Sequence, residues 1–159
     1  MVERVSLDAA RFAPPPHRFE AGTPDVASAL GLAAAIDYLC AHDRAALRRH
    51  EASLIAYAIE RLRELPGVRL LGAPAVDLDA GAESASLLSF VMEGVHAHDV
   101  GTILDGEGIA IRTGHHCAQP LIRRLGVPAT VRVSVGMYNT RADIDALIRG
   151  LGRTLEWFS

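Results

Sequence analysis

The chain has 159 residues, half of which are apolar, and its formal net charge is −3. A chain of this length and composition corresponds to about one domain and can bury a hydrophobic core, which excludes a disordered protein. Its arginines form no basic stripe, so the composition argues against nucleic acid as a partner. All sixteen basic residues are arginine, and the chain contains no lysine.

The sequence also argues against a secreted or membrane protein. Residues 1–8 carry charges where a signal peptide needs an apolar stretch. The longest apolar run, Val26 to Ile36, is too short to span a bilayer. Two cysteines, Cys40 and Cys117, are too few for a disulfide framework. We therefore expect a cytoplasmic protein with reduced thiols and no membrane partner.

The first forty residues predict a short strand and a helix. The apolar residues of 2–7 suggest a strand that ends before the prolines at 14–16. A helix is predicted from about residue 24 to residue 41, because Thr23 is a good N-cap and Asp25 complements the helix dipole. This helix is apolar on nearly every face, which normally means burial on all sides.

From about residue 43 onward, helices and strands alternate. Asp43 is expected to cap the second helix, and Thr140 with Asp143 resembles a capping box that opens the last one. Apolar residues at every second position predict strands, and those at every third or fourth position predict helices. The predicted order is a helix at 43–65, strands at 68–71 and 87–92, a short helix at 98–107, strands at 109–112 and 131–135, and a helix at 141–157.

This alternation predicts an α/β (α+β) fold, namely a two-layer sandwich of helices on a sheet. A domain of this size does not obviously cover so apolar a first helix. We therefore expect a division into residues 1–42 and residues 43–159, with the first segment belonging to a larger structure.

The segment from Arg112 to Pro120 carries the clearest sign of chemistry. It combines one thiol with two imidazoles, an arginine and a glycine that frees the backbone: Arg112, Gly114, His115, His116 and Cys117. A thiol is a nucleophile only as the thiolate, which neighbouring cationic groups favour. The alternative is a buried small hydrophobic residue, the commonest state of a free cysteine. We favour a reactive thiol at Cys117 and read Cys40 as structural.

The histidines also suggest a metal site, which would use Cys117 with His96, His98, His115 and His116. Adjacent ligands on one short loop rarely point at the same ion, and the chain has no C-x-x-C or H-x-x-x-H spacing. We therefore expect no metal. The simpler interpretation of His96 and His98 is a polar turn followed by the start of a helix.

Two further positions keep alternatives open. Arg132 lies on the polar side of the predicted 131–135 strand, where it suits either a carboxylate ligand or a solvated salt bridge. Gly22 and Thr23 precede a helix, where a phosphate can bind, although the Thr23 hydroxyl can equally satisfy the helix backbone.

Three motifs in this order resemble the C-terminal part of SufS-type (group II) cysteine desulfurases, in the class V aminotransferase superfamily. They are RFEAGTP at 18–24, HDVG at 98–101 leading to IRTGHHCAQP at 111–120, and VRVS at 131–134 leading to MYNT at 137–140. The resemblance covers essentially the whole chain, and the cysteine motif is the specific one.

The resemblance implies the small C-terminal domain of a fold-type I pyridoxal phosphate enzyme at residues 43–159, preceded by the end of the large domain and a linking helix at residues 1–42. It implies that the Cys117 thiolate takes the sulfur of L-cysteine with pyridoxal phosphate as cofactor, releasing alanine. The resulting persulfide would pass to a sulfur-acceptor protein for iron–sulfur cluster assembly.

The same resemblance implies roles for the other site residues. Arg132, assisted by Arg112, would bind the substrate carboxylate. Thr23, next to Gly22, would reach the cofactor phosphate of the opposite subunit in a homodimer. Gly114, His115 and His116 would support the cysteine loop.

The missing lysine is a departure from this family, in which a lysine of the large domain holds the cofactor. Without one, the chain cannot form an internal Schiff base. We therefore expect the chain to be inactive alone, and to use pyridoxal phosphate only together with a complementary large-domain chain. The alternatives are a cofactor-free persulfide carrier or interaction module, and a decayed fragment without activity.

Overall fold

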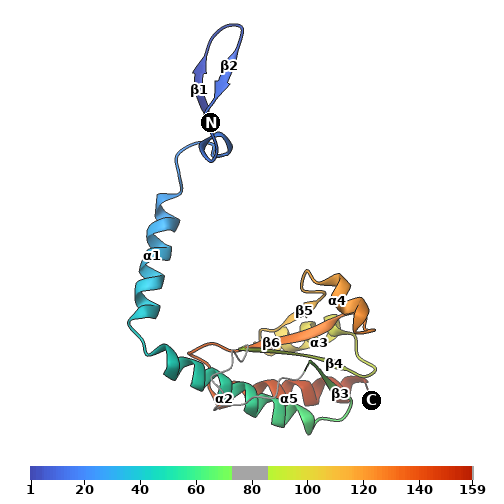
Figure 1. Ribbon diagram of the computed structural model, residues 1–159. Coiled ribbons are helices and arrows are strands. Elements are labelled where there is room, and N and C mark those ends of the chain that lie inside the picture. Colours follow the sequence, from blue (N-terminus) through green and yellow to red (C-terminus); the bar gives the residue numbers. More distant parts are fainter. Residues whose placement is uncertain (73–85, 159) are drawn as a thin grey trace. The chain divides into compact units, whose positions relative to one another are not determined.

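The computed structural model describes residues 1–72 and 86–158 (Figure 1). The chain divides into two compact units, Met1–Asp43 and a second unit that begins at Arg44. The predicted loop at 72–86 falls almost entirely outside the described residues. No helix within the described ranges is long and apolar enough to cross a membrane.

The first unit consists of a hairpin, a short 3-10 turn and a helix. Strands β1 (Val2–Val5) and β2 (Ala10–Phe12) pair antiparallel, and η1 (His17–Phe19) follows the prolines. Helix α1 covers Val26–Cys40. The predicted strand is present but shorter, whereas β2 was not predicted, because three residues give no readable periodicity.

Helix α1 starts differently from the prediction. Its N-cap is Asp25, whose carboxylate accepts a hydrogen bond from the backbone N–H of Ser28 at 3.0 Å. The prediction that Thr23 caps this helix is therefore wrong, because the Asp25 carboxylate directly precedes the first helical residue. None of the α1 residues is buried, and Cys40 at its end is exposed rather than structural.

The second unit is a two-layer sandwich of helices on a four-stranded antiparallel sheet, as predicted. Its sheet has the order β3-β4-β6-β5. The elements are α2 (Arg44–Arg63), β3 (Val68–Leu71), β4 (Leu87–Met92), α3 (Ala97–Gly106), β5 (Arg112–Gly114), α4 (Gln119–Arg124), β6 (Thr130–Ser134) and α5 (Arg141–Phe158). The strand predicted at 109–112 is displaced to 112–114, and α4 was not predicted.

The core of this unit lies between one face of the sheet and its long helices. Alternate residues of β4 and β6 are buried there: Leu88, Phe90, Met92, Val131 and Val133. They pack with apolar residues of α2, α3 and α5, such as Ile55, Leu62, Leu104 and Leu151. The period of two along each strand leaves the other positions, including Ser89 and Arg132, on the opposite face.

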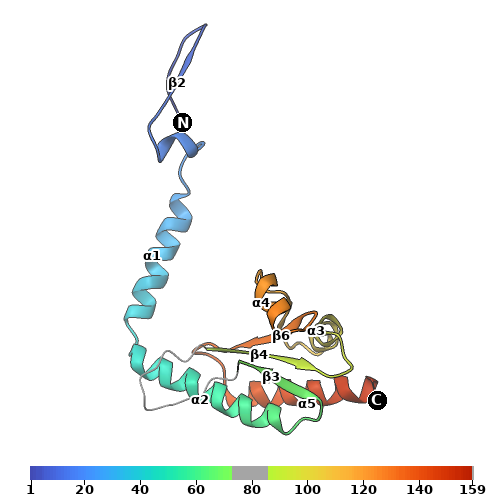
Figure 2. The same ribbon diagram turned by 45° about the vertical axis from the view of Figure 1, so that its right-hand side comes forward.

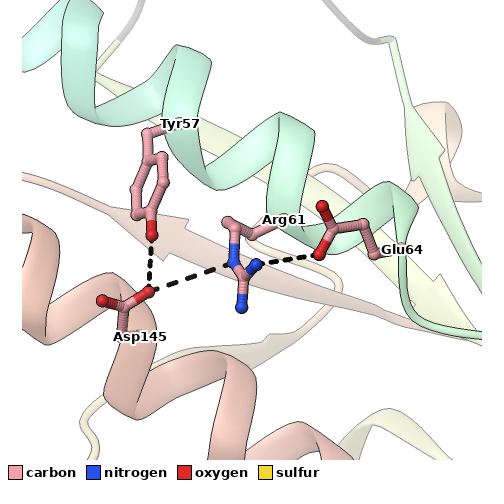
Figure 3. A network of polar contacts seen from close by, with 4 residues as sticks. All are labelled: Tyr57, Arg61, Glu64 and Asp145. Atoms are coloured by element: carbon pink, nitrogen blue, oxygen red, sulfur yellow. Dashed lines mark hydrogen bonds and ion pairs between the residues drawn. The ribbon is translucent and has the colours of Figure 1, made fainter.

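A polar network fastens α2 to α5 at the rim of this core (Figure 3). Tyr57 donates a hydrogen bond to Asp145 at 2.7 Å, and this bond raises the pKa of the phenol. Arg61 lies 3.9 Å from the same carboxylate and 2.9 Å from Glu64. The guanidinium of Arg141 stacks over the Tyr57 ring. This network holds together α2 and α5, the two helices drawn below the sheet in Figures 1 and 2.

Candidate functional site

Two arginines face each other on neighbouring strands at one edge of the sheet. Arg112 on β5 is the register partner of Arg132 on β6, and Arg132 is in turn the partner of Ser89 on β4. Like charges directly opposite each other destabilise an antiparallel pair. Neither arginine forms an ion pair within the described ranges. An anion held between them would offset this repulsion.

Arg132 is suited to receive such an anion. Its side chain is partly buried, and its Nε is buried without a hydrogen-bond partner among the residues described. A buried, unpaired guanidinium N–H is costly, and a carboxylate is the ligand that matches its planar fork. Arg112 is exposed and adds the second positive charge. The two positive charges and the unpaired Nε of Arg132 match what a small carboxylate requires of a binding site.

Cys117 lies in the loop between these two strands, and it is exposed. Gly114 ends β5 with a φ of +119°, and His116 and Cys117 follow with φ of 53° and 58°. Two consecutive non-glycine residues in the left-handed region are rare and persist only where the surroundings hold them. The alternative that Cys117 is a buried hydrophobic residue is therefore wrong.

The two histidines hold this loop against the strand that carries Arg132. His115 Nε2 donates to the carbonyl of Pro128 at 3.0 Å. His116 Nε2 is hydrogen-bonded to Thr130 Oγ1 at 2.8 Å, and Thr130 is buried at the start of β6. Each imidazole thus ties the left-handed turn to the chain just before or at β6.

Burial lowers the pKa of His116 below its ordinary value, and the charges of Arg132 and Arg112 act in the same direction. A hydrogen bond with the backbone of Thr130 opposes this effect without cancelling it. His116 is therefore neutral at pH 7. The permanent positive charge of the segment from Arg112 to Pro120 is that of Arg112 alone.

Helix α3 supports β5 from the side through the HDVG motif. A Cβ on Gly101 would lie 3.0 Å from Thr113 Cγ2, so only glycine allows this approach without a shift. His96 is the N-cap of α3, and its Nδ1 accepts from the backbone N–H of His98 at 3.2 Å. The interpretation of His96 and His98 as a polar helix start is confirmed. Among residues 1–72 and 86–158, no three potential metal ligands cluster together.

The second unit thus contains six of the predicted site residues, all on or between β5 and β6: Arg112, Gly114, His115, His116, Cys117 and Arg132. Gly22 and Thr23 lie in the first unit, just before α1, where Gly22 has a φ of +80°. Sequence reasoning missed Thr130 and Ser89. Thr130 is related to the site by its hydrogen bond with His116, and Ser89 by its strand register with Arg132.

Comparison with known proteins identifies the family. The model of the aminotransferase class-V family matches residues 1–147. The chain belongs to this family. It is 46% identical over 158 residues to a "Probable cysteine desulfurase" of Streptomyces coelicolor, covering 99% of this chain and 37% of that protein. It is 45% identical to "Probable cysteine desulfurase 2" of Mycobacterium leprae, with the same coverage.

Solved structures agree with these relatives. The cysteine desulfurase CsdA from Escherichia coli, solved in an S-sulfonic acid form, shares 39% identity with a TM-score of 0.78, over 100% of this chain and 38% of that one. An apo cysteine desulfurase from Thermococcus onnurineus shares 37% identity and has the same TM-score, and the match covers 98% of this chain and 37% of that one. The chain therefore has the fold of cysteine desulfurases and spans little more than a third of their length.

Proposed function

We propose that this chain contributes the sulfur-accepting part of a SufS-type cysteine desulfurase, with Cys117 as the nucleophile. The observation that carries this proposal is the exposed Cys117 thiol, held in a left-handed turn between the strands of Arg112 and Arg132. The 46% identity to a probable cysteine desulfurase over nearly the whole chain supports it.

In the proposed reaction, the two arginines bind the carboxylate of L-cysteine and thereby orient its sulfur toward the loop. The Cys117 thiolate attacks that sulfur. A new S–S bond forms, the C–S bond of the substrate breaks, and its electron pair stays on the carbon fragment that leaves as alanine. The product on the enzyme is a persulfide at Cys117. We propose that its outer sulfur passes to an acceptor protein for iron–sulfur cluster assembly.

The electron pair of that C–S bond needs an acceptor, which pyridoxal phosphate supplies in the family that the motifs resemble. The residues of this chain do not hold it by themselves, because no lysine is available for a Schiff base. Gly22 and Thr23 offer at most a phosphate contact. We propose that the lysine and the rest of the cofactor site come from a large domain, of which residues 1–42 are the end, within a cytoplasmic homodimer.

Mass spectrometry tests the role of Cys117. The full chain is incubated with cysteine persulfide, whose outer sulfur the Cys117 thiolate attacks while cysteine thiolate leaves. We expect one added sulfur atom on wild-type protein and on Cys40→Ser, and none on Cys117→Ala. Sulfur that remains on Cys117→Ala, or that is found on Cys40 alone, would contradict the proposal.

A second function, that of a cofactor-free persulfide carrier, is favoured by the exposure of this thiol in a chain without lysine. Alanine release separates the two functions. A desulfurase half should release no alanine from L-cysteine and pyridoxal phosphate alone, but should do so when a lysine-bearing large-domain chain of the family is added. A carrier should accept sulfur equally well with and without that chain, and should never release alanine.

A further inference from the structure

The charges of this chain are distributed unevenly around the thiol. Residues 108–142 contain five arginines and not a single aspartate or glutamate. The other residues hold eleven arginines and all nineteen carboxylate side chains, so they are strongly negative. Cys117 thus lies in a basic segment of an acidic protein.

Two of the five arginines have no other evident use. Arg123 and Arg124 end α4, are exposed, and form no ion pair within the described part of the chain. By contrast, Arg61 and Arg153 pair with Glu64 and Glu107. Arg123 and Arg124 are therefore free to bind charges from outside.

Helix α4 begins two residues after Cys117 and is about 9 Å long at 1.5 Å per residue. Arg123 and Arg124 follow Cys117 by six and seven positions. Such a chain segment spans at most about 25 Å, which is within the Debye length of about 30 Å at a low salt concentration of 0.01 M. Ile122 is buried and anchors the helix, whereas Leu121 is 54% and Leu125 is 37% exposed. Residues four apart lie on the same helical face. The surface beside the thiol thus combines an apolar pair with two unpaired positive charges.

We propose that α4 is the docking surface for the sulfur-acceptor protein, and that this acceptor presents its own thiol among acidic and apolar side chains. The inference rests on the proposed function. During transfer, the acceptor thiolate attacks the outer sulfur of the Cys117 persulfide, a new S–S bond forms on the acceptor, and Cys117 leaves as thiolate. Arg123 and Arg124 draw in the acidic rim, and the leucines bind its apolar part.

A protein fits this surface better than a nucleic acid does. A phosphate backbone is bound by a stripe of basic residues, whereas α4 offers two arginines beside exposed leucines. The residues outside 108–142 carry a net negative charge, which disfavours the binding of a polyanion. Recognition of an acidic partner must therefore be local, through α4.

The test uses the full chain as Cys40→Ser and two peptides, each with one cysteine activated as a 2-pyridyl disulfide. In one peptide the cysteine is flanked by leucine and glutamates, and in the other glutamines replace the glutamates. The Cys117 thiolate attacks the peptide sulfur and expels pyridine-2-thione, whose absorbance gives the rate. We expect the acidic peptide to react about tenfold faster at low salt, and this preference to shrink as salt is added.

The double variant Arg123→Gln, Arg124→Gln should lose the preference, whereas the control Arg63→Gln, Arg69→Gln, two exposed arginines on α2 and β3, should keep it. Equal rates for both peptides, or equal loss in both variants, would overturn the docking surface and leave the persulfide role of Cys117 intact. Protection of Cys117 by a single-stranded oligonucleotide, but not by a glutamate-rich peptide without cysteine, would also overturn it. A Cys117 inert toward both peptides would overturn the proposed function itself.

Discussion

His116 and Thr130 are joined by a 2.8 Å hydrogen bond that links the turn containing Cys117 to the first residue of β6. Thr130 is 2% exposed, so water does not readily replace this bond. The backbone at His116 and Cys117 is left-handed, and a conformation of that kind needs such support.

Replacing Thr130 by valine should therefore loosen the Cys117 turn. The change keeps the shape of the side chain but removes the hydrogen-bond partner of the partly buried His116 imidazole, which costs on the order of 1 kcal/mol. Urea unfolding should show this loss, and iodoacetamide should alkylate Cys117 at a changed rate in a Cys40→Ser background. Thr130→Ser keeps the hydroxyl and should behave like wild type. Equal effects of valine and serine would show that the methyl group, rather than the hydrogen bond, matters.

The lowered pKa of His116 predicts a pH dependence of stability. Below the ordinary histidine value of 6.5, the unfolded chain protonates this imidazole before the folded chain does. The contribution of His116 to stability is therefore complete above pH 6.5 and is lost as the pH falls below it. The difference in unfolding free energy between wild type and His116→Gln should shrink from pH 7.5 to pH 5.5. A difference that stays constant over this range would contradict the neutral, partly buried state of His116.

The facing arginines predict stabilisation by carboxylates. Acetate binds only the folded pair, so it should raise the melting temperature of wild type. Arg132→Gln should remove most of this effect, because it removes both the buried Nε and the like-charge repulsion with Arg112. Arg69→Gln on β3 serves as the control at the other edge of the sheet. An acetate effect that is the same in all three proteins would rule out binding at the pair.

Two glycines of α3, one facing β5 and one facing open space, allow the close packing of α3 against β5 to be tested with matched variants. Gly106→Ala meets no atom within 4 Å and should stabilise the helix by up to about 1 kcal/mol. Gly101→Ala places a methyl group 3.0 Å from Thr113 Cγ2 and should lose that gain or destabilise. Thermal unfolding of both variants checks the difference. Equal stabilisation by both would mean that Thr113 moves aside freely.

The exposed apolar side chains of α1 predict self-association of the chain on its own. Leu30, Leu32 and Ile36 are each more than half exposed, and contiguous apolar patches rarely stay solvated. Light scattering should detect oligomers or aggregates, and replacing these three residues by glutamine should reduce them. Leu87→Gln on β4 is the control and should leave the amount of oligomers and aggregates unchanged. A monodisperse wild-type monomer would contradict this expectation.

Periodicity alone predicted the elements that build the sandwich. The last helix and the strands at 68–71 and 87–92 matched within one residue, because their apolar positions repeat over several turns or alternate cleanly. The strand predicted at 109–112 was misplaced, since Ile109 and Ile111 pack against the core from a loop instead of pairing in the sheet. Helix α4 was missed because six residues with a proline at the second position give little pattern.

The site was predictable in its residue types but not in its geometry. The cluster around Cys117 could be read directly from adjacent residues. The opposition of Arg112 and Arg132, twenty positions apart, depends on a strand register that the misplaced strand would have shifted. The neutral state of His116 depends on its burial beside Thr130, for which a linear sequence has no signal.

The antiparallel pairing of β5 with β6 places the two arginines on the strands and the Cys117 thiol in the loop that joins them. Gly114 pairs with Thr130 and closes the base of a loop, 115–129, whose ends are fixed whatever lies between them. Cys117 is only three residues beyond this base, and the hydrogen bonds of His115 and His116 hold its turn there. Residues inserted after α4 would therefore lengthen the loop while leaving both the thiol and the facing arginines in place.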